Sequence, residues 1–417
     1  YARGGLDIIN VGSNAPSGGG ALNDIHASLT VHCEDNVDGA GDILNVDNSG
    51  DNTDNSAILT DKSITGLGMG GSLSYYTIEE LNIDLGSGND NFITLNNGTI
   101  TNLNTGAGND RVQVGPTLDE DGVPQDETLD GIVTPGSEIL GTSYLMTVYA
   151  GAGEDAFEVN RNTAELKLYG EAENDTITVN TAISSRRHLS NALVDFSGGE
   201  GTNQGFINGS EIADEMIIRG DSVEIVDSHL INLAKIAFLD IKAKKGQDIF
   251  HIDTNIDSSG NILATSDIQN LEVDGGDSED TINVYGMRST TDIKLYGGSQ
   301  DDTFNIGSES TTTVNNISGA VEIFGDADDS RITNQDSDTL NINDNQDTAN
   351  NTGVLTDDEI SGLGLGKDLI YKGLETVNIN LGTGDDNFTV KSTHTGATNI
   401  NANDGKDKIQ ITAISGD

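Results

Sequence analysis

The residues of this chain best able to do chemistry are aspartates that recur in glycine-rich turns. The stretch "LGSGNDNF" occupies residues 85–92, and "LGTGDDNF" returns at residues 381–388. In the first turn, Gly86 and Gly88 permit a crowded backbone whose carbonyl oxygens turn inward, and Asp90 adds a carboxylate. Such oxygens together suit a hard cation, and calcium tolerates loose geometry better than magnesium does.

The turn aspartate recurs in pairs that are 20 to 22 residues apart. Because one turn offers too few ligands for calcium, we expect the turns of successive coils to lie above one another and to share the cation. The predicted calcium ligands are the aspartates Asp90, Asp110, Asp155, Asp175, Asp280, Asp302, Asp386 and Asp407, and the glycines Gly86, Gly88, Gly106, Gly108, Gly151, Gly153, Gly382 and Gly384. A second interpretation stays open, in which Asn and Asp simply close tight turns by bonding to nearby backbone.

Short alternating segments lie between these turns and must position them. "ELNIDL", "DTITVN" and "DTFNI" alternate apolar with polar residues, which is typical of a half-buried strand. Coils stacked at the strand spacing of ~4.8 Å bury one continuous inward row of Ile, Val, Leu and Phe. We therefore predict an all-β fold, a parallel β-solenoid (β-helix) built from coils of about 20 residues with loop insertions. A string of antiparallel sandwiches is the competing fold.

The composition argues against a wide globular core and against anionic partners. The 417 residues include 52 glycines and no tryptophan, and only 4 % of the residues are aromatic. The formal charge of −49 opposes compaction unless cations neutralise it, so the alternative for a cation-free chain is disorder. We do not expect nucleic acid as a partner, because both molecules carry negative charge. We do not expect membrane insertion, because no apolar stretch is long enough to span a bilayer.

A long repeat of about 296 residues is superimposed on the short one. Residues 58–92 match residues 354–388 at 19 of 35 positions without a gap, which indicates a window from a longer array. The predicted organisation is solenoid coils over 1–115, a Pro- and acid-rich loop insertion over 116–142, further coils over 143–337, and the start of the next long repeat over 338–417, matching 42–114.

The turns resemble the glycine- and aspartate-rich nonapeptide of RTX (haemolysin-type) calcium-binding repeats, G-G-x-G-x-D-x-U-x. "LGSGNDNFI", "TGAGNDRVQ", "AGAGEDAFE" and "LGTGDDNFT" keep the two later glycines, the aspartate and the buried apolar residue. The resemblance implies Ca2+ held by turn carbonyls and Asp carboxylates of stacked turns. The first glycine is replaced by Leu85, Thr105, Ala150 and Leu381, and there is one acidic turn per coil rather than two. The pattern is thus closer to the divergent repeats of giant extracellular surface or adhesin-type proteins. At "AKKGQDIF", we expect Lys244 or Lys245 to replace the metal beside Asp248.

These observations indicate a non-enzymatic structural segment of an extracellular, calcium-stabilised filament or giant cell-surface protein. Its contribution is length, rigidity and surface presentation, and its expected partners are copies of itself or neighbouring repeats, end to end. One alternative is an adhesin stalk that binds a glycan or a surface. Another is a β-helical polysaccharide lyase or epimerase, whose catalytic residues leave no linear motif, although a chain of charge −49 offers little basic surface for a polyanionic sugar.

Overall fold

The computed structural model describes eight stretches of the chain: residues 5–15, 17–33, 41–117, 141–181, 192–263, 267–307, 313–326 and 336–414. The chain divides into two compact units, residues 1–206 with 227–236 and residues 207–226 with 237–417. No helix of the described residues is long and apolar enough to cross a membrane. Most of the loop insertion predicted at 116–142 lies outside the described residues.

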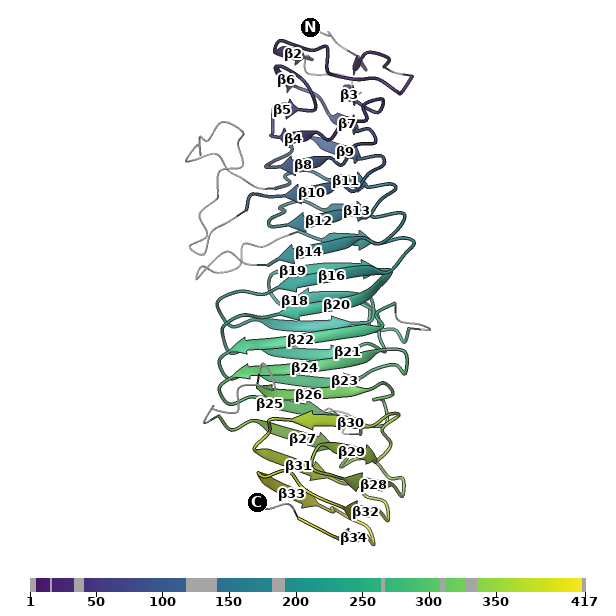
Figure 1. Ribbon diagram of the computed structural model, residues 1–417, viewed down its shortest axis with the longest axis vertical. Coiled ribbons are helices and arrows are strands. Elements are labelled where there is room, and N and C mark those ends of the chain that lie inside the picture. Colours follow the sequence, from purple (N-terminus) through teal and green to yellow (C-terminus); the bar gives the residue numbers. More distant parts are fainter. Residues whose placement is uncertain are drawn as a thin grey trace. The chain divides into compact units, whose positions relative to one another are not determined.

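The first unit contains a sheet in which each coil contributes one strand, and every pairing is parallel (Figure 1). Its strands, in order of contact, are β1 (Ile8–Val11), β3 (Ile43–Asp47), β7 (Glu80–Asp84), β9 (Ile100–Asn104), β11 (Met146–Tyr149), β13 (Leu166–Tyr169), β15 (Val194–Ser197) and β19 (His229–Ala234). Parallel neighbours in this order mean that the chain leaves the sheet and returns one coil further on, as in a solenoid.

The return path of the first unit forms the facing sheet. It contains β2 (Leu29–His32), β6 (Ser72–Tyr76), β5 (Ser63–Gly66), β4 (Ser56–Leu59), β8 (Asn91–Thr94), β10 (Arg111–Val114), β12 (Ala156–Val159) and β14 (Thr176–Asn180), and β16 (Asn203–Asn208) begins in this unit. The pairs β6–β5 and β5–β4 are antiparallel, whereas β2–β6, β4–β8, β8–β10, β10–β12 and β12–β14 are parallel.

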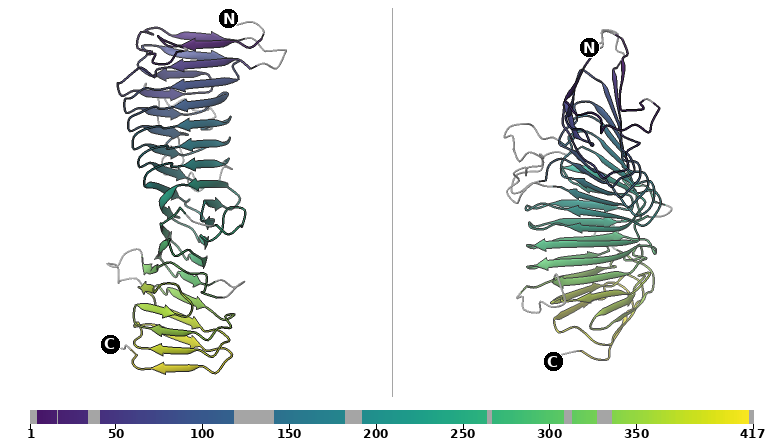
Figure 2. Two further views of the ribbon diagram at one scale, coloured as in Figure 1. Left: turned by 90° about the vertical axis from the view of Figure 1, so that its right-hand side faces the viewer. Right: turned by 45° about the horizontal axis from the view of Figure 1, so that its top comes forward.

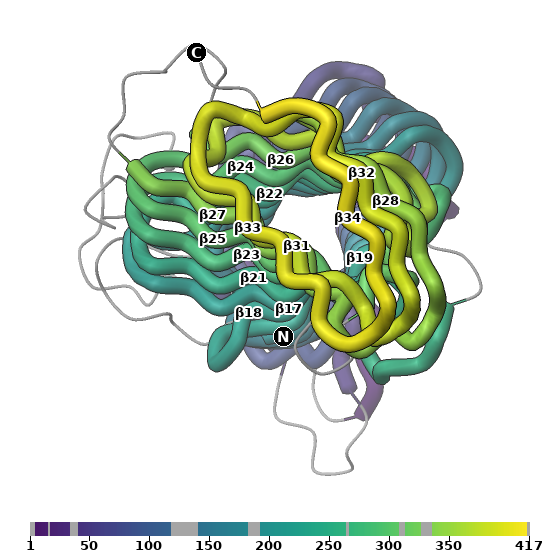
Figure 3. The backbone as a smooth tube through the Cα atoms, turned by 90° about the horizontal axis from the view of Figure 1, so that it is seen from below, coloured from purple at the N-terminus to yellow at the C-terminus, as the bar shows by residue number. Residues whose placement is uncertain are grey.

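The second unit repeats this plan. One sheet holds β18 (Ser222–Ile225), β17 (Glu215–Arg219), β21 (Ile249–Asp253), β23 (Thr281–Gly286), β25 (Thr303–Ile306), β27 (Thr339–Asn343), β31 (Thr376–Asn380) and β33 (Ala397–Asn401). The other holds β20 (Ile236–Lys242), most of which belongs to this unit, β22 (Asn270–Asp277), β24 (Asp292–Ser299), β26 (Val321–Asp326), β30 (Leu369–Lys372), β29 (Glu359–Gly362), β28 (Thr352–Leu355), β32 (Asn387–Val390) and β34 (Lys408–Ile411). Seen end-on, β31 and β33 lie on one side of the coil, and β32 and β34 on the other (Figure 3).

The core of each unit is a stack of inward side chains in register from coil to coil. Phe92 pairs with Val112 and Val112 with Phe157, and all three are at most 2 % exposed. In the other sheet of this unit, Leu103 of β9 and Val148 of β11 are fully buried and pair directly. Alternation places these residues inward and their neighbours outward, and the strands stack within each unit (Figure 2).

The all-β parallel solenoid predicted from the sequence is confirmed, because the coil-to-coil pairings are parallel. The shortest coils have the predicted length, since Leu81 pairs with Thr101 and Leu271 with Ile293. Other coils are longer: Leu44 pairs with Leu81, and that coil also holds β4, β5 and β6. The antiparallel-sandwich alternative is wrong, since the strands of successive coils pair in parallel. Antiparallel pairs occur locally, as in β4–β5–β6, β17–β18 and β28–β29–β30.

Candidate cation-binding turns

The aspartates that the sequence pairs at 20 to 22 residues do lie one coil apart. In every pair, the backbone N–H of the first aspartate donates a hydrogen bond to Oδ1 of the second. The N···O distances are 2.7 Å for Asp90–Asp110, 3.0 Å for Asp155–Asp175, 2.8 Å for Asp280–Asp302 and 2.9 Å for Asp386–Asp407. The predicted stacking of successive turns is therefore confirmed.

In the first unit these bonds join into one continuous inner ladder. Its N–H to Oδ1 steps are Asn55 to Asp90, Asp90 to Asp110, Asp110 to Asp155, Asp155 to Asp175, and Asp175 to Asn203. The step from Asp110 to Asp155 is 2.7 Å long although 45 residues separate them, because β10 and β12 are adjacent strands. Coil position, and not sequence distance, sets the neighbours.

An outer ladder runs beside the inner one and in the opposite direction. The N–H of Asn109 donates to Oδ1 of Asn89 at 2.8 Å, and the N–H of Glu154 donates to Oδ1 of Asn109 at 3.0 Å. Here the later coil donates to the earlier one, whereas in the inner ladder the earlier coil donates to the later one. The dipeptide Asn-Asp of the motif thus ties each coil to both of its neighbours.

Inner ladders occur on both turns of the coil, and some coils belong to both: β7 lies between Glu79 of one ladder and Asp90 of the other. In the second unit, its steps follow the strands β20, β22, β24 and β26 and join Asp214, Asp248, Asp280, Asp302, Asp338 and Glu375. A separate ladder of that unit lies on the other turn and joins Asn351, Asp386 and Asp407. In the first unit, the turn opposite the main ladder joins Asp7, Asp42 and Glu79.

The inner carboxylates are buried, and their second oxygens lack hydrogen bonds. Oδ2 of Asp90, Asp110, Asp155 and Asp175 has no hydrogen-bond partner in the structure, and neither has Oδ2 of Asp248, Asp280, Asp302 and Asp386. Burial raises the pKa of Asp90 to about 6, of Asp155 to about 7 and of Asp175 to about 6. It raises the pKa of Asp248 and Asp302 to about 8, and of Asp280 and Asp338 to about 7. Without a cation, the carboxyl groups of Asp248 and Asp302 hold protons at neutral pH, and those of Asp90 and Asp175 take them up below about pH 6.

The predicted glycines lie at the same turns, but they act by allowing close approach. A Cβ on Gly106 would lie 2.1 Å from the carbonyl oxygen of Gly86, and one on Gly151 would lie 2.0 Å from that of Gly106. The Gly86 and Gly106 carbonyls accept hydrogen bonds from the N–H groups of Ala107 and Ala152, at 3.0 and 3.1 Å. These carbonyls therefore point along the stack and not into a shared cavity.

The donor set fits calcium in part. It supplies one buried carboxylate oxygen per coil and strong negative charge, both of which calcium requires. It is short of the six to eight oxygens that calcium takes, since the glycine carbonyls already bond to the next coil, and no group of three or more His, Cys, Asp or Glu side chains in the described residues is placed to hold a metal. Water would have to complete the shell.

The lysines expected to replace a metal beside Asp248 behave differently. Nζ of Lys245 lies 2.7 Å from Oε2 of Glu211, on the exposed side of the turn. The groups that act on the Asp248 carboxyl are the Asp214 N–H and the carboxylates of Asp280 and Asp214. Lys245 therefore pairs with a glutamate at the surface, and no lysine is among the groups that shift the pKa of Asp248.

The glycine pattern misses several ladder residues, namely Asp7, Asp42, Asp214, Asp338, Glu375, Asn55 and Asn203. A weaker signal marks three of the aspartates. Asp42, Asp214 and Asp338 each stand two residues before a fully buried apolar residue, as Asp90 does. The position before the strand, and not the preceding glycines, defines the ladder.

No protein-family model matches the chain, and no curated protein matches it closely enough to indicate a relative. The resemblance to RTX repeats therefore rests on the residues of the turns alone.

Proposed function

We propose that this chain is a non-enzymatic structural segment of an extracellular, calcium-stabilised filament or giant cell-surface protein. The observation that carries the proposal is the pair of opposed ladders, which tie each coil to the coil before it and the coil after it. A stack bonded in this way resists bending and separation of coils, which suits a protein whose work is to give length and rigidity.

The last described coil supports the proposal of association end to end. Ile409 and Ile411 of β34 stand in register with buried residues of β32, yet they are 38 % and 62 % exposed. An exposed strand edge beside apolar side chains favours pairing with another strand. We propose a neighbouring repeat or another copy of the chain as the partner.

Calcium enters the proposal as the neutraliser of the buried carboxylates. A row of carboxylates one coil apart repels itself once ionised, and the chain as a whole carries −49. Divalent cations that bind the folded stack and not the unfolded chain add stability, about 2.7 kcal/mol at a concentration one hundred times the Kd. Protons compete with cations for the same oxygens, so the calcium effect is larger at pH 8 than at pH 5.

The test measures thermal unfolding of the whole chain in EDTA and in calcium, at pH 5 and pH 8, with electron microscopy of the same samples. We expect calcium to raise Tm at pH 8, and the triple variant Asp110→Asn/Asp155→Asn/Asp175→Asn to lose most of that increase. The control is Asp368→Asn, which changes an exposed aspartate outside the ladders. Equal Tm values with and without calcium overturn the calcium part, and irregular, non-elongated particles in both conditions overturn the structural role.

A further inference from the structure

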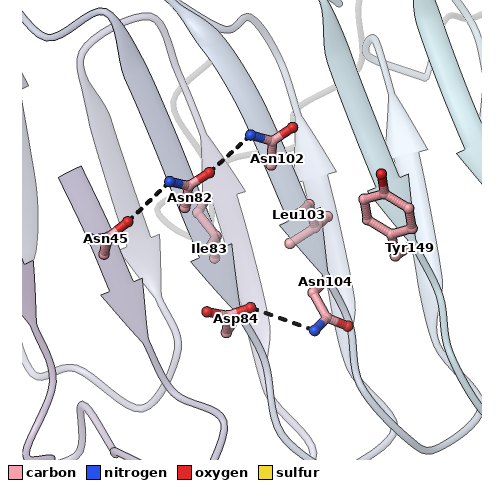
Figure 4. Close-up of a pocket in the computed structure, with 8 residues that line it drawn as sticks. All are labelled: Asn45, Asn82, Ile83, Asp84, Asn102, Leu103, Asn104 and Tyr149. Atoms are coloured by element: carbon pink, nitrogen blue, oxygen red, sulfur yellow. Dashed lines mark hydrogen bonds between the residues drawn. The ribbon is translucent and has the colours of Figure 1, made fainter. Parts of the chain in front are cut away.

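A shallow depression lies on the outward face of the first unit, across β3, β7, β9 and β11 (Figure 4). Its volume is about 390 Å³, within the range of about 300–1,000 Å³ that small-molecule sites occupy. Six outward side chains line it: Asn45, Asn82, Asp84, Asn102, Asn104 and Tyr149. Ile83 and Leu103 contribute only their outward backbone, since their side chains are buried in the core. None of the lining residues is basic.

A row of amides forms the floor. Nδ2 of Asn82 donates to Oδ1 of Asn45 at 2.9 Å, and Nδ2 of Asn102 donates to Oδ1 of Asn82 at 2.8 Å. Each bond uses one of the two amide N–H groups and one of the two lone pairs, so Asn45 and Asn82 each keep a further donor. Nδ2 of Asn102 also donates to Oε1 of Glu80, at 3.4 Å. Successive steps are separated by the strand spacing of ~4.8 Å, which gives a regular strip of paired donors and acceptors.

An aromatic ring and a carboxylate stand beside this floor. The Tyr149 ring stacks on Tyr169 with centroids 5.1 Å apart and an interplanar angle of 11°, and Tyr149 remains 41 % exposed. Because Asn104, Tyr149 and Tyr169 are consecutive in register, the ring face that does not meet Tyr169 is turned toward Asn104 and the depression. Asp84 accepts a bond from Nδ2 of Asn104 at 3.4 Å and supplies acceptor oxygens.

We infer that this depression binds an uncharged, extended saccharide. Sugar hydroxyls donate and accept at once, which matches the spare N–H groups of Asn45 and Asn82 and the lone pairs of the amide oxygens. The apolar C–H face of a pyranose ring packs on an exposed aromatic ring. Anionic glycans and nucleic acids are disfavoured, because the lining has a carboxylate and no cation and the chain carries −49. This inference is independent of whether the turns hold calcium.

The second unit provides a natural control for the aromatic wall. Its row of amides joins Asn283, Asn305, Asn341, Asn378 and Asn399 with bonds of 2.8 to 2.9 Å. Asn378 occupies there the place of Asn82, in "VNIN" against "LNID". Within the described residues, β33 is the last strand of this sheet, and no tyrosine there stands where Tyr149 stands in the first unit. Comparison of the two rows therefore distinguishes binding by the amides alone from binding that also needs the tyrosine ring.

The test is affinity electrophoresis of the whole chain through gels that contain hydroxyethylcellulose, dextran or mannan, with alginate as the anionic comparison. Titration calorimetry with cellohexaose then gives the Kd. We expect retardation by at least one neutral polysaccharide and none by alginate. Tyr149→Ala and Asn82→Ala are expected to raise the Kd at least about tenfold, whereas Tyr149→Phe keeps the ring face and changes it less than threefold.

The matched control is Asn378→Ala, which is expected to leave the Kd unchanged. Circular dichroism verifies that each variant folds, and Asn82→Ala tests the site even where Tyr149→Ala does not fold. Mobility that no neutral polysaccharide changes overturns the inference. So does binding that survives Tyr149→Ala, or that falls equally in Asn82→Ala and Asn378→Ala.

Discussion

The ten strands β1–β10 of the first unit have counterparts in β25–β34 of the second, in the same order and with the same pairings. The antiparallel strands β4–β5–β6 correspond to β28–β29–β30. A buried tyrosine closes both: the hydroxyl of Tyr75 donates to the Thr60 carbonyl at 2.7 Å, and that of Tyr371 donates to the Thr356 carbonyl at 2.7 Å. Similar sequence has thus produced the same local structure twice.

The two copies differ at their last coil. Val112 and Val114 of β10 are 2 % and 1 % exposed, whereas their counterparts Ile409 and Ile411 of β34 are 38 % and 62 % exposed. The reason lies in the next coil, since β10 is covered by β12, and in the described residues β34 pairs only with β32. An inward residue of a solenoid is therefore buried by its neighbouring coil and not by its own.

The largest expected effect distinguishes the covered strand β10 from the exposed strand β34. Val114→Asp places a carboxylate inside the stack, and we expect it to lower the free energy of unfolding of the first unit by on the order of 4 kcal/mol. Ile411→Asp changes an exposed residue and is expected to cost less than about 0.5 kcal/mol. Hydrogen exchange at the amides of β8–β12 and β32–β34 measures both. Equal losses would mean that β34 is covered in solution.

Where the copies are alike, equal effects are expected. Gly66 has φ of +91° and Gly362 has φ of +81°, and a Cβ on either would lie 1.9 Å from the carbonyl oxygen of Ser56 or Thr352. Gly66→Ala and Gly362→Ala should each lower stability by about 3 kcal/mol. Gly260→Ala separates the two causes, because Gly260 has φ of +78° with nothing within 4 Å, and its expected cost is about 1 kcal/mol. Calorimetry of the three variants measures whether the contact between the Cβ and the carbonyl oxygen costs stability in addition to the positive φ angle.

The ladder makes stability depend on pH. The pKa of Asp155 rises on folding from the unfolded value of about 3.9 to about 7, so the protonated carboxyl stabilises the fold below pH 4 and this contribution is lost as pH rises through 7. Asp155→Asn removes this loss and should stabilise the chain at pH 8 by on the order of 2 kcal/mol in EDTA. The amide keeps the bridging acceptor, as Asn203 does when its Oδ1 takes the Asp175 N–H at 2.8 Å.

Unfolding midpoints in urea from pH 4 to pH 8 measure this effect. Asp407→Asn is the comparison in the last described coil, where the side chain is partly exposed, and it is expected to change the midpoint at pH 8 less than Asp155→Asn does. A steeper slope in Asp155→Asn than in the natural chain would contradict the assignment.

The sequence was sufficient to predict the solenoid and the stacking of the turns, because strand alternation and the regular return of Asp90, Asp110 and their equivalents are local patterns. It was not sufficient to predict what the aspartates bond to. Whether a carboxylate meets a cation or an N–H depends on the backbone of the adjacent coil, which for the Asp155 carboxylate is supplied by Asp110, 45 residues earlier. The amide floor beside Tyr149 was hidden for the same reason, since its residues come from four strands between Asn45 and Tyr149.

The smallest expected effect concerns the tyrosines. Tyr75→Phe and Tyr371→Phe each remove one buried hydrogen bond and should each cost about 1 kcal/mol. The stability costs in the two copies are expected to differ only when the aromatic ring is removed as well. Tyr371 meets the His394 ring edge-on with centroids 6.0 Å apart, and Gly98 occupies the place of His394 in the first copy. Tyr371→Leu should therefore cost about 0.5–1 kcal/mol more than Tyr75→Leu. Equal costs of the two leucine variants would show that the contact between the Tyr371 and His394 rings adds no stability. The two tyrosines would then contribute equally to the stability of their copies.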